Sequence, residues 1–132
     1  MELNKEQTIK LKNKLISFSE ELGEIIKNRG VEITIPLVSN YNSYGGLTFK
    51  VRKNYFGYET NKTRFILIYD INYKDREDED YVYNLWKYKN DYISYYRDFM
   101  LDILMNKDEI FRVVNEKIKS DEKLLNSILG DD

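Results

Sequence analysis

The sequence predicts an α+β fold in a single domain that covers residues 1–132. Three patterns predict it: helical periodicity near the N-terminus, alternating apolar residues in the middle, and helical periodicity again in the last part. A chain of 132 residues with 42% hydrophobic and 33% charged side chains is typical of one folded domain. We expect an N-terminal helix, a three-stranded antiparallel meander, a long aromatic-rich helix and one or two C-terminal helices. The helices should pack mainly on one face of the sheet.

The first helix is predicted from Asn4 to Arg29. Its apolar residues recur at alternating spacings of four and three, which places them on one face of a helix. These residues are Leu11, Leu15, Phe18, Leu22 and Ile25. Gly30 follows in the C′ position, where a residue with left-handed backbone commonly ends a helix.

Three strands are predicted in the middle of the chain. Val31 to Val38 alternates between apolar and polar residues, and Pro36 suits an edge or a strand end because it cannot donate a hydrogen bond. A second strand runs from Leu47 to about Phe56, and Gly57 to Thr63 makes the next connection. Arg64 to Ile71 is apolar on both faces, which favours a central strand. The short loops between the strands imply an antiparallel meander.

A long aromatic helix is predicted from Tyr81 onward, because helical spacing fits this region better than strand alternation does. Asp78 or Asp80 can cap its start, where the helix dipole favours acidic residues. One apolar stripe comprises Tyr81, Leu85, Tyr88, Tyr92, Tyr95 and Phe99, and an adjoining one Val82, Trp86, Ile93, Tyr96, Met100 and Ile103. The opposite, polar face comprises Asn84, Lys87, Asp91, Ser94, Asp98 and Asp102. The apolar arc is wide enough to allow a homodimer through Tyr88, Tyr92 and Tyr96.

The C-terminal part is predicted to be helical, with two alternatives for its division. Asn106 to Glu109 resembles a capping box that opens a helix with Ile110, Phe111, Val114 and Ile118 facing inward. Ser120 could then cap a last short helix that ends at Gly130, or the two segments could form one helix. The apolar residues of the last segment are Leu124, Leu125, Ile128 and Leu129.

The residue types present argue against an enzyme. Cysteine and histidine are both absent, which excludes disulfides, thiolate nucleophiles, Cys/His zinc sites and imidazole acid-base catalysis. The alternating acids Asp75, Glu77 and Glu79 lack the glycine and the distal glutamate of a calcium loop. Gly45 and Gly46 precede a strand rather than a helix, so no phosphate-binding loop is indicated. We therefore expect no catalytic residues, no metal site and no cofactor.

Composition also bears on location. No apolar stretch approaches the roughly 18 residues of a membrane helix, and the first residues lack the apolar region of a signal peptide. The formal charge of −2 does not by itself imply a nucleic-acid partner or a membrane surface. We expect a cytoplasmic protein with no membrane association.

The first candidate site is an acidic-aromatic segment that precedes the long helix. Tyrosines at its ends could anchor a complex, and its carboxylates could steer a basic partner protein toward it. The simpler interpretation is a solvated loop whose acids cap the next helix. The segment comprises Tyr73, Asp75, Glu77, Asp78, Glu79, Asp80 and Tyr83.

The second candidate site is a basic hairpin with interleaved aromatic residues. Stacking of bases on aromatic rings beside a basic groove is how single-stranded nucleic acids are bound. The simpler interpretation is an ordinary solvated strand face, on which only Lys50 and Arg52 are sure to point outward together. The hairpin comprises Lys50, Arg52, Lys53, Tyr55, Tyr58, Lys62 and Arg64, with Glu59 as its one acid.

These patterns favour a non-catalytic protein-binding module. Abundant Asn, Lys, Ile and Tyr, all with A/T-rich codons, are typical of a low-GC genome such as that of a phage or mobile element. We expect a small inhibitor or immunity-type protein that occupies a basic, nucleic-acid-binding surface of its target, such as a host defence nuclease. The alternative is a nucleic-acid-binding module that uses the basic, tyrosine-bearing hairpin.

Overall fold

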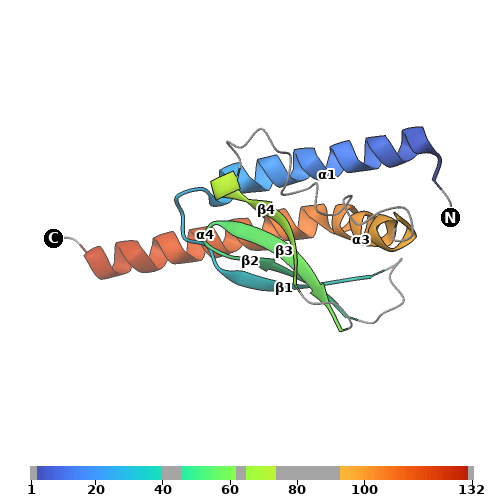
Figure 1. The fold of residues 1–132 in the computed structure, drawn as a ribbon. Helices are drawn as coiled ribbons and strands as arrows, with labels where there is room; N and C mark the ends of the chain where they lie inside the picture. The colour runs from blue at the N-terminus through green and yellow to red at the C-terminus, as the bar shows by residue number, and fades with distance from the viewer. Residues whose placement is uncertain (1–2, 40–45, 62–64, 74–92, 131–132) are drawn as a thin grey trace.

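The computed structural model describes residues 3–39, 46–61, 65–73 and 93–130. Within these ranges the chain forms an α+β fold, so the predicted class is confirmed (Figure 1). The elements are α1 (Lys5–Ile26), β1 (Ile33–Leu37), β2 (Leu47–Val51), β3 (Tyr55–Thr60), β4 (Ile66–Asp70), the 3-10 helix η1 (Ile71–Tyr73), α3 (Ile93–Met105) and α4 (Lys107–Leu129).

Helix α1 begins at a capping box. The Asn4 side chain accepts a hydrogen bond from the Gln7 backbone N–H at 2.8 Å, and the Gln7 side chain accepts one from the Asn4 N–H at 3.0 Å. Both contacts satisfy backbone donors that the helix itself leaves unpaired. The predicted apolar stripe is confirmed, with Leu15, Phe18 and Leu22 buried in the core.

The end of α1 differs from the prediction. The helix stops at Ile26, and the first residue with left-handed backbone is Asn28, at φ 63°. Gly30 also has φ 63°, but it lies in the turn after the helix and not at the C′ position. Asparagine tolerates the left-handed region better than most residues, so it reverses the chain before the glycine is reached.

The sheet is an antiparallel meander, as predicted, but the described residues form four strands in the order β1-β2-β3-β4 rather than three. The predicted second strand, 47–56, is interrupted where the Arg52 N–H donates to the Tyr55 carbonyl at 2.8 Å and closes a hairpin. The stretch predicted as a connection instead forms β3. It pairs because Phe56 and Tyr58 lie opposite Val51 and Phe49 and extend the same apolar face.

Strand β4 was predicted to be central, and among the described strands it lies at the edge, next to β3. A β-bulge, rather than a central position in the sheet, explains why β4 is apolar on both faces. The register shifts between Phe56 and Gly57, a β-bulge that leaves Ile68 outside the ladder of residue pairs. Ile68 and the neighbouring Tyr69 are consequently both fully buried, although adjacent strand residues normally face opposite sides.

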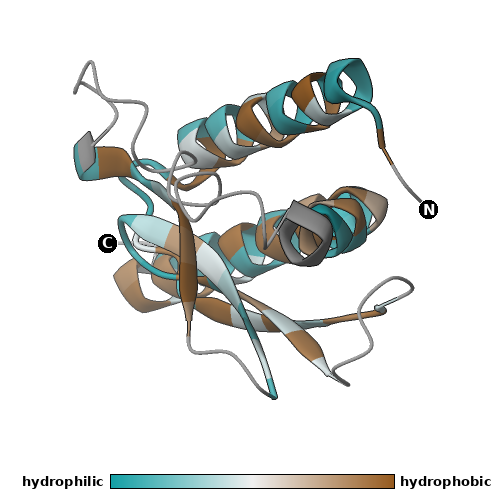
Figure 2. Cartoon of the chain, turned by 45° about the vertical axis from the view of Figure 1, so that its right-hand side comes forward, coloured by the Kyte–Doolittle hydropathy of each residue, from teal (hydrophilic) through white to brown (hydrophobic). Residues whose placement is uncertain are grey.

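The core lies between the helices and one face of the sheet. The Phe18 ring on α1 makes edge contacts with Phe49 of β2 at 6.1 Å, Phe56 of β3 at 6.5 Å and Phe111 of α4 at 5.3 Å between centroids. Helices α1 and α4 therefore cover the same face, as predicted. Figure 2 shows the corresponding alternation of hydrophilic and hydrophobic residues along α1.

Helix α3 contains the second half of the predicted aromatic helix, whose first half, from Tyr81 to Tyr92, lies outside the described residues. Phe99, Met100 and Ile103 are buried, which confirms this part of the predicted stripe. Asp102 was predicted on the polar face and is also fully buried, so its assignment was wrong.

Helix α4 is continuous from Lys107 to Leu129, which confirms the single-helix alternative. Ser120 lies inside it and starts no new helix. The predicted capping box is wrong, because the Asn106 side chain makes no capping hydrogen bond to α4. That side chain is used in a tertiary contact instead.

The close approach of α1 to β4 gives a stability prediction. An added Cβ at Gly23 would lie 2.5 Å from the Tyr69 ring, which is fully buried and stacked on Phe56 at 5.1 Å. Helix propensity alone would make Gly23→Ala stabilising by about 1 kcal/mol, whereas overpacking costs about 1–3 kcal/mol. We expect a net loss of about 1 kcal/mol in the free energy of unfolding, measured by urea denaturation.

The matched control is Gly46→Ala, whose added Cβ would meet only the Asn61 side chain at 3.7 Å, an ordinary contact. Its effect should stay within about 0.5 kcal/mol. A more stable Gly23→Ala protein would contradict the close packing of α1 on β4.

Candidate protein-interaction surfaces

Most of the acidic-aromatic segment lies outside the described residues, namely Asp75, Glu77, Asp78, Glu79, Asp80 and Tyr83. Tyr73 ends η1. The residues before the segment are attached to the sheet, since the Ile71 N–H donates to the Asn54 carbonyl at 2.8 Å and the Asn72 N–H to the Asp70 carboxylate at 2.9 Å. After the segment, α3 is fixed by its buried apolar residues.

Some charged side chains of the basic hairpin interact with groups of the sheet itself. Lys50 forms an ion pair with Glu59 on the neighbouring strand, with 2.8 Å between Nζ and Oε2. The Arg52 guanidinium donates to the carbonyls of Val51 at 3.0 Å and Ile33 at 3.5 Å. Arg52 lies just beyond the end of β2, and both side chains already have partners within the sheet.

The tyrosines of the hairpin do not form one surface. Tyr58 was predicted as a contact residue, but its ring is fully buried, 4.8 Å from that of Phe99. The reason is register, because Tyr58 lies opposite the core residue Phe49. Tyr55 is 39% exposed and Lys53 is exposed, whereas Lys62 and Arg64 lie outside the described residues.

A polar cluster joins the end of β1 to the junction between α3 and α4. The Asn106 amide donates to the Val38 carbonyl at 2.8 Å and accepts from the Val38 N–H at 3.3 Å. It also donates to the Asp102 carbonyl at 2.6 Å, and the Ser39 hydroxyl donates to the buried Asp102 carboxylate at 2.7 Å. No sequence pattern predicts this cluster, because its halves are more than 60 residues apart.

The outer face of α4 is a charged helix surface. Arg112 donates to Glu109 one turn before it and to Glu116 one turn after it, at 2.5–3.0 Å. The hydrogen bond from the Arg112 guanidinium lowers the pKa of the Glu109 carboxyl below its usual value. These i,i+3 and i,i+4 pairs are typical of a solvated face.

The inner face of α4 is covered along only part of its length. Ile110 and Val114 are fully buried, and Ile118 packs against the core. The C-terminal part of the helix extends past the sheet and past the end of α1 (Figure 1). The residues that continue the apolar face there are exposed: Leu124 by 61%, Leu125 by 53%, Ile128 by 72% and Leu129 by 57%. We call these four residues the apolar stripe.

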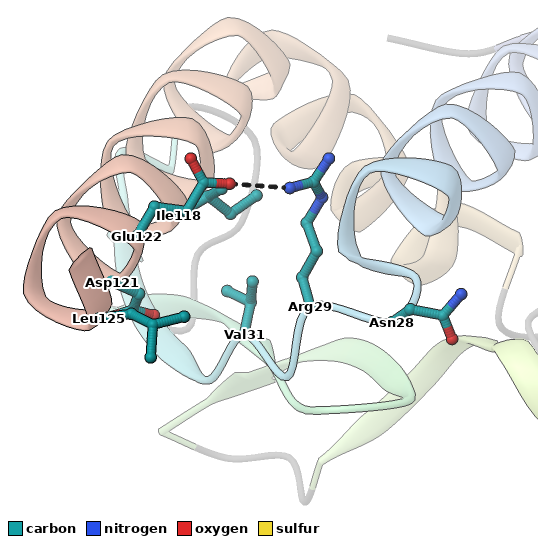
Figure 3. A pocket seen from close by; sticks show the side chains of 7 residues that line it. All are labelled: Asn28, Arg29, Val31, Ile118, Asp121, Glu122 and Leu125. Atoms are coloured by element: carbon teal, nitrogen blue, oxygen red, sulfur yellow. Dashed lines mark hydrogen bonds and ion pairs between the residues drawn. The ribbon is translucent and has the colours of Figure 1, made fainter. Parts of the chain in front are cut away.

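A hollow of about 270 Å³ lies where the apolar stripe meets the body of the protein. Arg29, in the turn after α1, reaches across it to Glu122 on α4, with 3.1 Å between Nη1 and Oε1 (Figure 3). Its apolar lining comes from Val31, Ile118 and Leu125.

A second depression, of about 540 Å³, runs between α1 and the α3–α4 junction. Lys14, Lys107 and Glu21 are the charged residues among its lining. Its apolar lining comprises Leu11, Phe18, Leu101, Leu104, Met105 and Phe111.

Within the described ranges, no three acidic side chains lie together in a way that could hold a metal ion. The described helices include none that is both long and apolar enough to cross a bilayer. No protein-family model, curated protein or solved structure matches the chain.

The contact between Asn106 and Val38 gives the second stability prediction. Aspartate suits the start of a helix as well as asparagine does, so helix capping alone predicts little change for Asn106→Asp. The carboxylate cannot donate to the Val38 carbonyl or to the Asp102 carbonyl, and a hydrogen bond of this kind contributes about 0.5–1.5 kcal/mol. We expect a clear fall in the urea midpoint for Asn106→Asp.

Asn115→Asp is the matched control, because Asn115 lies exposed on the same helix. Its effect should stay within about 0.5 kcal/mol. Equal midpoints for the two variants would show that the amide contact contributes little to stability.

Proposed function

We propose that the protein is a non-catalytic protein-binding module, an inhibitor or immunity-type protein that occupies a basic, nucleic-acid-binding surface of its target. A host defence nuclease is the kind of target we have in mind, and a phage or mobile element the kind of source. The observation that carries the proposal is the acidic-aromatic segment, in which five of the six residues from Asp75 to Asp80 are acidic.

The chemistry of this segment suits a basic partner. Closely spaced carboxylates imitate a row of phosphates and accelerate encounter with a positive surface. Tyrosines beside them, at Tyr73 and Tyr83, supply rigid rings that contribute binding energy once water is removed. The attachment of η1 to the sheet at Asn54 and Asp70 supports the proposal, because it fixes the point from which the segment starts.

Nucleic-acid binding through the basic hairpin is not favoured by a specific observation. Base stacking needs exposed rings, and Tyr58 is buried. Phosphate binding needs free cations, and Lys50 and Arg52 have partners within the sheet.

The proposal predicts that the acids are required for capture of the target. Replacing Glu77, Asp78, Glu79 and Asp80 by their amides removes four negative charges with little change in size. We expect this variant to lose a partner that the wild-type protein retains in affinity capture with mass spectrometry. Capture by the wild type should also weaken as salt rises, because screening reduces attraction between exposed charges.

The matched control neutralises four exposed acids elsewhere, at Glu20, Glu21, Glu32 and Asp108, and changes the net charge equally. This control should retain the partner. If the segment variant and Tyr83→Ala both capture as well as the wild type, the acidic-aromatic segment is not the contact surface.

A second prediction separates the two functions. We expect no shift of labelled single-stranded or double-stranded nucleic acid by the wild-type protein at low salt, where electrostatic binding is strongest. A shift that Lys50→Glu together with Arg52→Glu abolishes would establish the hairpin as a nucleic-acid site and contradict our proposal.

A further inference from the structure

The apolar stripe on α4 is the continuation of a face that is buried elsewhere in the protein. Ile118 and Leu125 lie seven residues apart, as do Asp121 and Ile128. With 3.6 residues per turn, both pairs fall on the side of α4 that Val114 presents to the core. The sheet and α1 end before this face does. The exposed leucines and isoleucine are therefore a helix face built for packing that lacks a cover among the described residues.

The residues of the apolar stripe have the spacing of a helix surface that packs against another helix. Leu125 and Ile128 take the two seam positions of a heptad, and Leu124 and Leu129 border the seam on either side. This arrangement surrounds a seam with apolar residues, as in helix pairs that pack closely. A sheet would require no such repeat.

We propose that the apolar stripe is a dimerisation surface, on which the same stripe of a second copy packs antiparallel about a two-fold axis. A two-fold interface uses one surface twice, so that surface must be compatible with itself. This contact is separate from the acidic-aromatic segment and from the proposed function. It also differs from the homodimer expected through Tyr88, Tyr92 and Tyr96.

The charges around the stripe permit self-association. The acidic residues at its start are neutralised within the protein: Asp121 pairs with Lys117 at 3.0 Å, and Glu122 pairs with Arg29 at 3.1 Å. Lys119 and Lys123 equal these two acids in number. Helical periodicity places both lysines on the side of α4 opposite the apolar stripe. Among the described residues, two copies that meet through this face consequently bring together no excess of like charge.

The shape of the surface also provides a site for the second copy. The hollow beside Leu125 is lined by Val31 and Ile118 together with the polar residues Asn28, Arg29, Asp121 and Glu122, and its volume of about 270 Å³ is large enough for an aliphatic side chain beside Val31 and Ile118. In an antiparallel pair, the end of each helix points back toward the body of the other copy. Ile128 of one copy can then enter the hollow of its partner, and the reverse contact follows by symmetry.

The size of the apolar stripe determines the affinity that we expect for the dimer. Four exposed aliphatic residues form a patch of a few hundred Å², the size at which apolar patches mark contact sites. Two such patches with their surroundings bury on the order of 1,000 Å² in total, the lower end for specific interfaces. We therefore expect a reversible dimer whose population depends on protein concentration.

Sedimentation equilibrium of the full chain over a wide concentration range tests the proposal. We expect a monomer–dimer equilibrium for the wild type, and for Ile128→Glu a dissociation constant at least about tenfold higher, because a charge would enter an apolar interface. Ile128 is 72% exposed, so the variant should keep the wild-type circular dichroism spectrum and urea midpoint. A wild-type protein that stays monomeric at millimolar concentration would overturn the proposal.

The matched control is Asn126→Glu, which adds the same charge two residues earlier, outside the stripe. It should leave the dissociation constant of the dimer unchanged. Equal effects of Ile128→Glu and Asn126→Glu would place the contact elsewhere and contradict the proposal. The four-amide variant of the acidic segment should dimerise as the wild type does, which separates this inference from the proposed function.

The absence of cysteine from the sequence permits a second readout. Leu125→Cys and Asn126→Cys each introduce a single thiol at an exposed position of the same helix turn. Under mild oxidation with copper–phenanthroline, Leu125→Cys should form disulfide-linked dimers faster, because the two copies of residue 125 face each other near the axis. Equal rates for the two variants would count against the antiparallel pair.

Discussion

The position of the Phe18 ring is the constraint on which the arrangement of the layers depends. This buried residue touches aromatic rings from two strands and from α4, so one side chain of α1 fixes both the sheet and the C-terminal helix. Edge contacts between rings depend on orientation, which makes such a cluster more specific than an aliphatic core of equal area. The packing of Gly23 on Tyr69 then sets how closely α1 can approach β4.

The same core explains why the chain presents the surfaces that it does. Alternate residues of β2 and β3 contribute aromatic rings to the core. The described cations of the basic hairpin therefore lie outside the core, whereas Tyr58 is buried in it. The amide of Asn106 ties the end of β1 to the start of α4 and thereby directs that helix along the sheet. Helix α4 is longer than the layer that it covers, so the apolar residues of its last turns are exposed to solvent.

We thus propose two contact regions of opposite character for this chain. The acidic-aromatic segment is suited to long-range attraction and fast encounter with a basic protein, because charge acts over about a Debye length. The apolar stripe acts only at contact, where the removal of water from leucine and isoleucine provides the driving force. In our proposals the first selects the target and the second joins two copies, so that a dimer would present the acidic segment twice and bind a target with two basic sites more tightly.

The sequence by itself determined the apolar faces of α1 and α4, the faces of β1 and β2 and the absence of cysteine and histidine chemistry, because periodicity and residue type are local properties. It predicted the α1 stripe around Leu15 and Leu22 and the inward faces of β1 and β2, but it missed the hairpin at Arg52, which is closed by one backbone hydrogen bond. Only the tertiary structure decided that β4 lies at the edge among the described strands, that Asp102 is buried and that the apolar face of α4 extends beyond the sheet and α1. Each of these features depends on which segments that are distant in the sequence pack together. A hydrophobic pattern within one segment does not indicate which other segment it contacts or how far that segment extends.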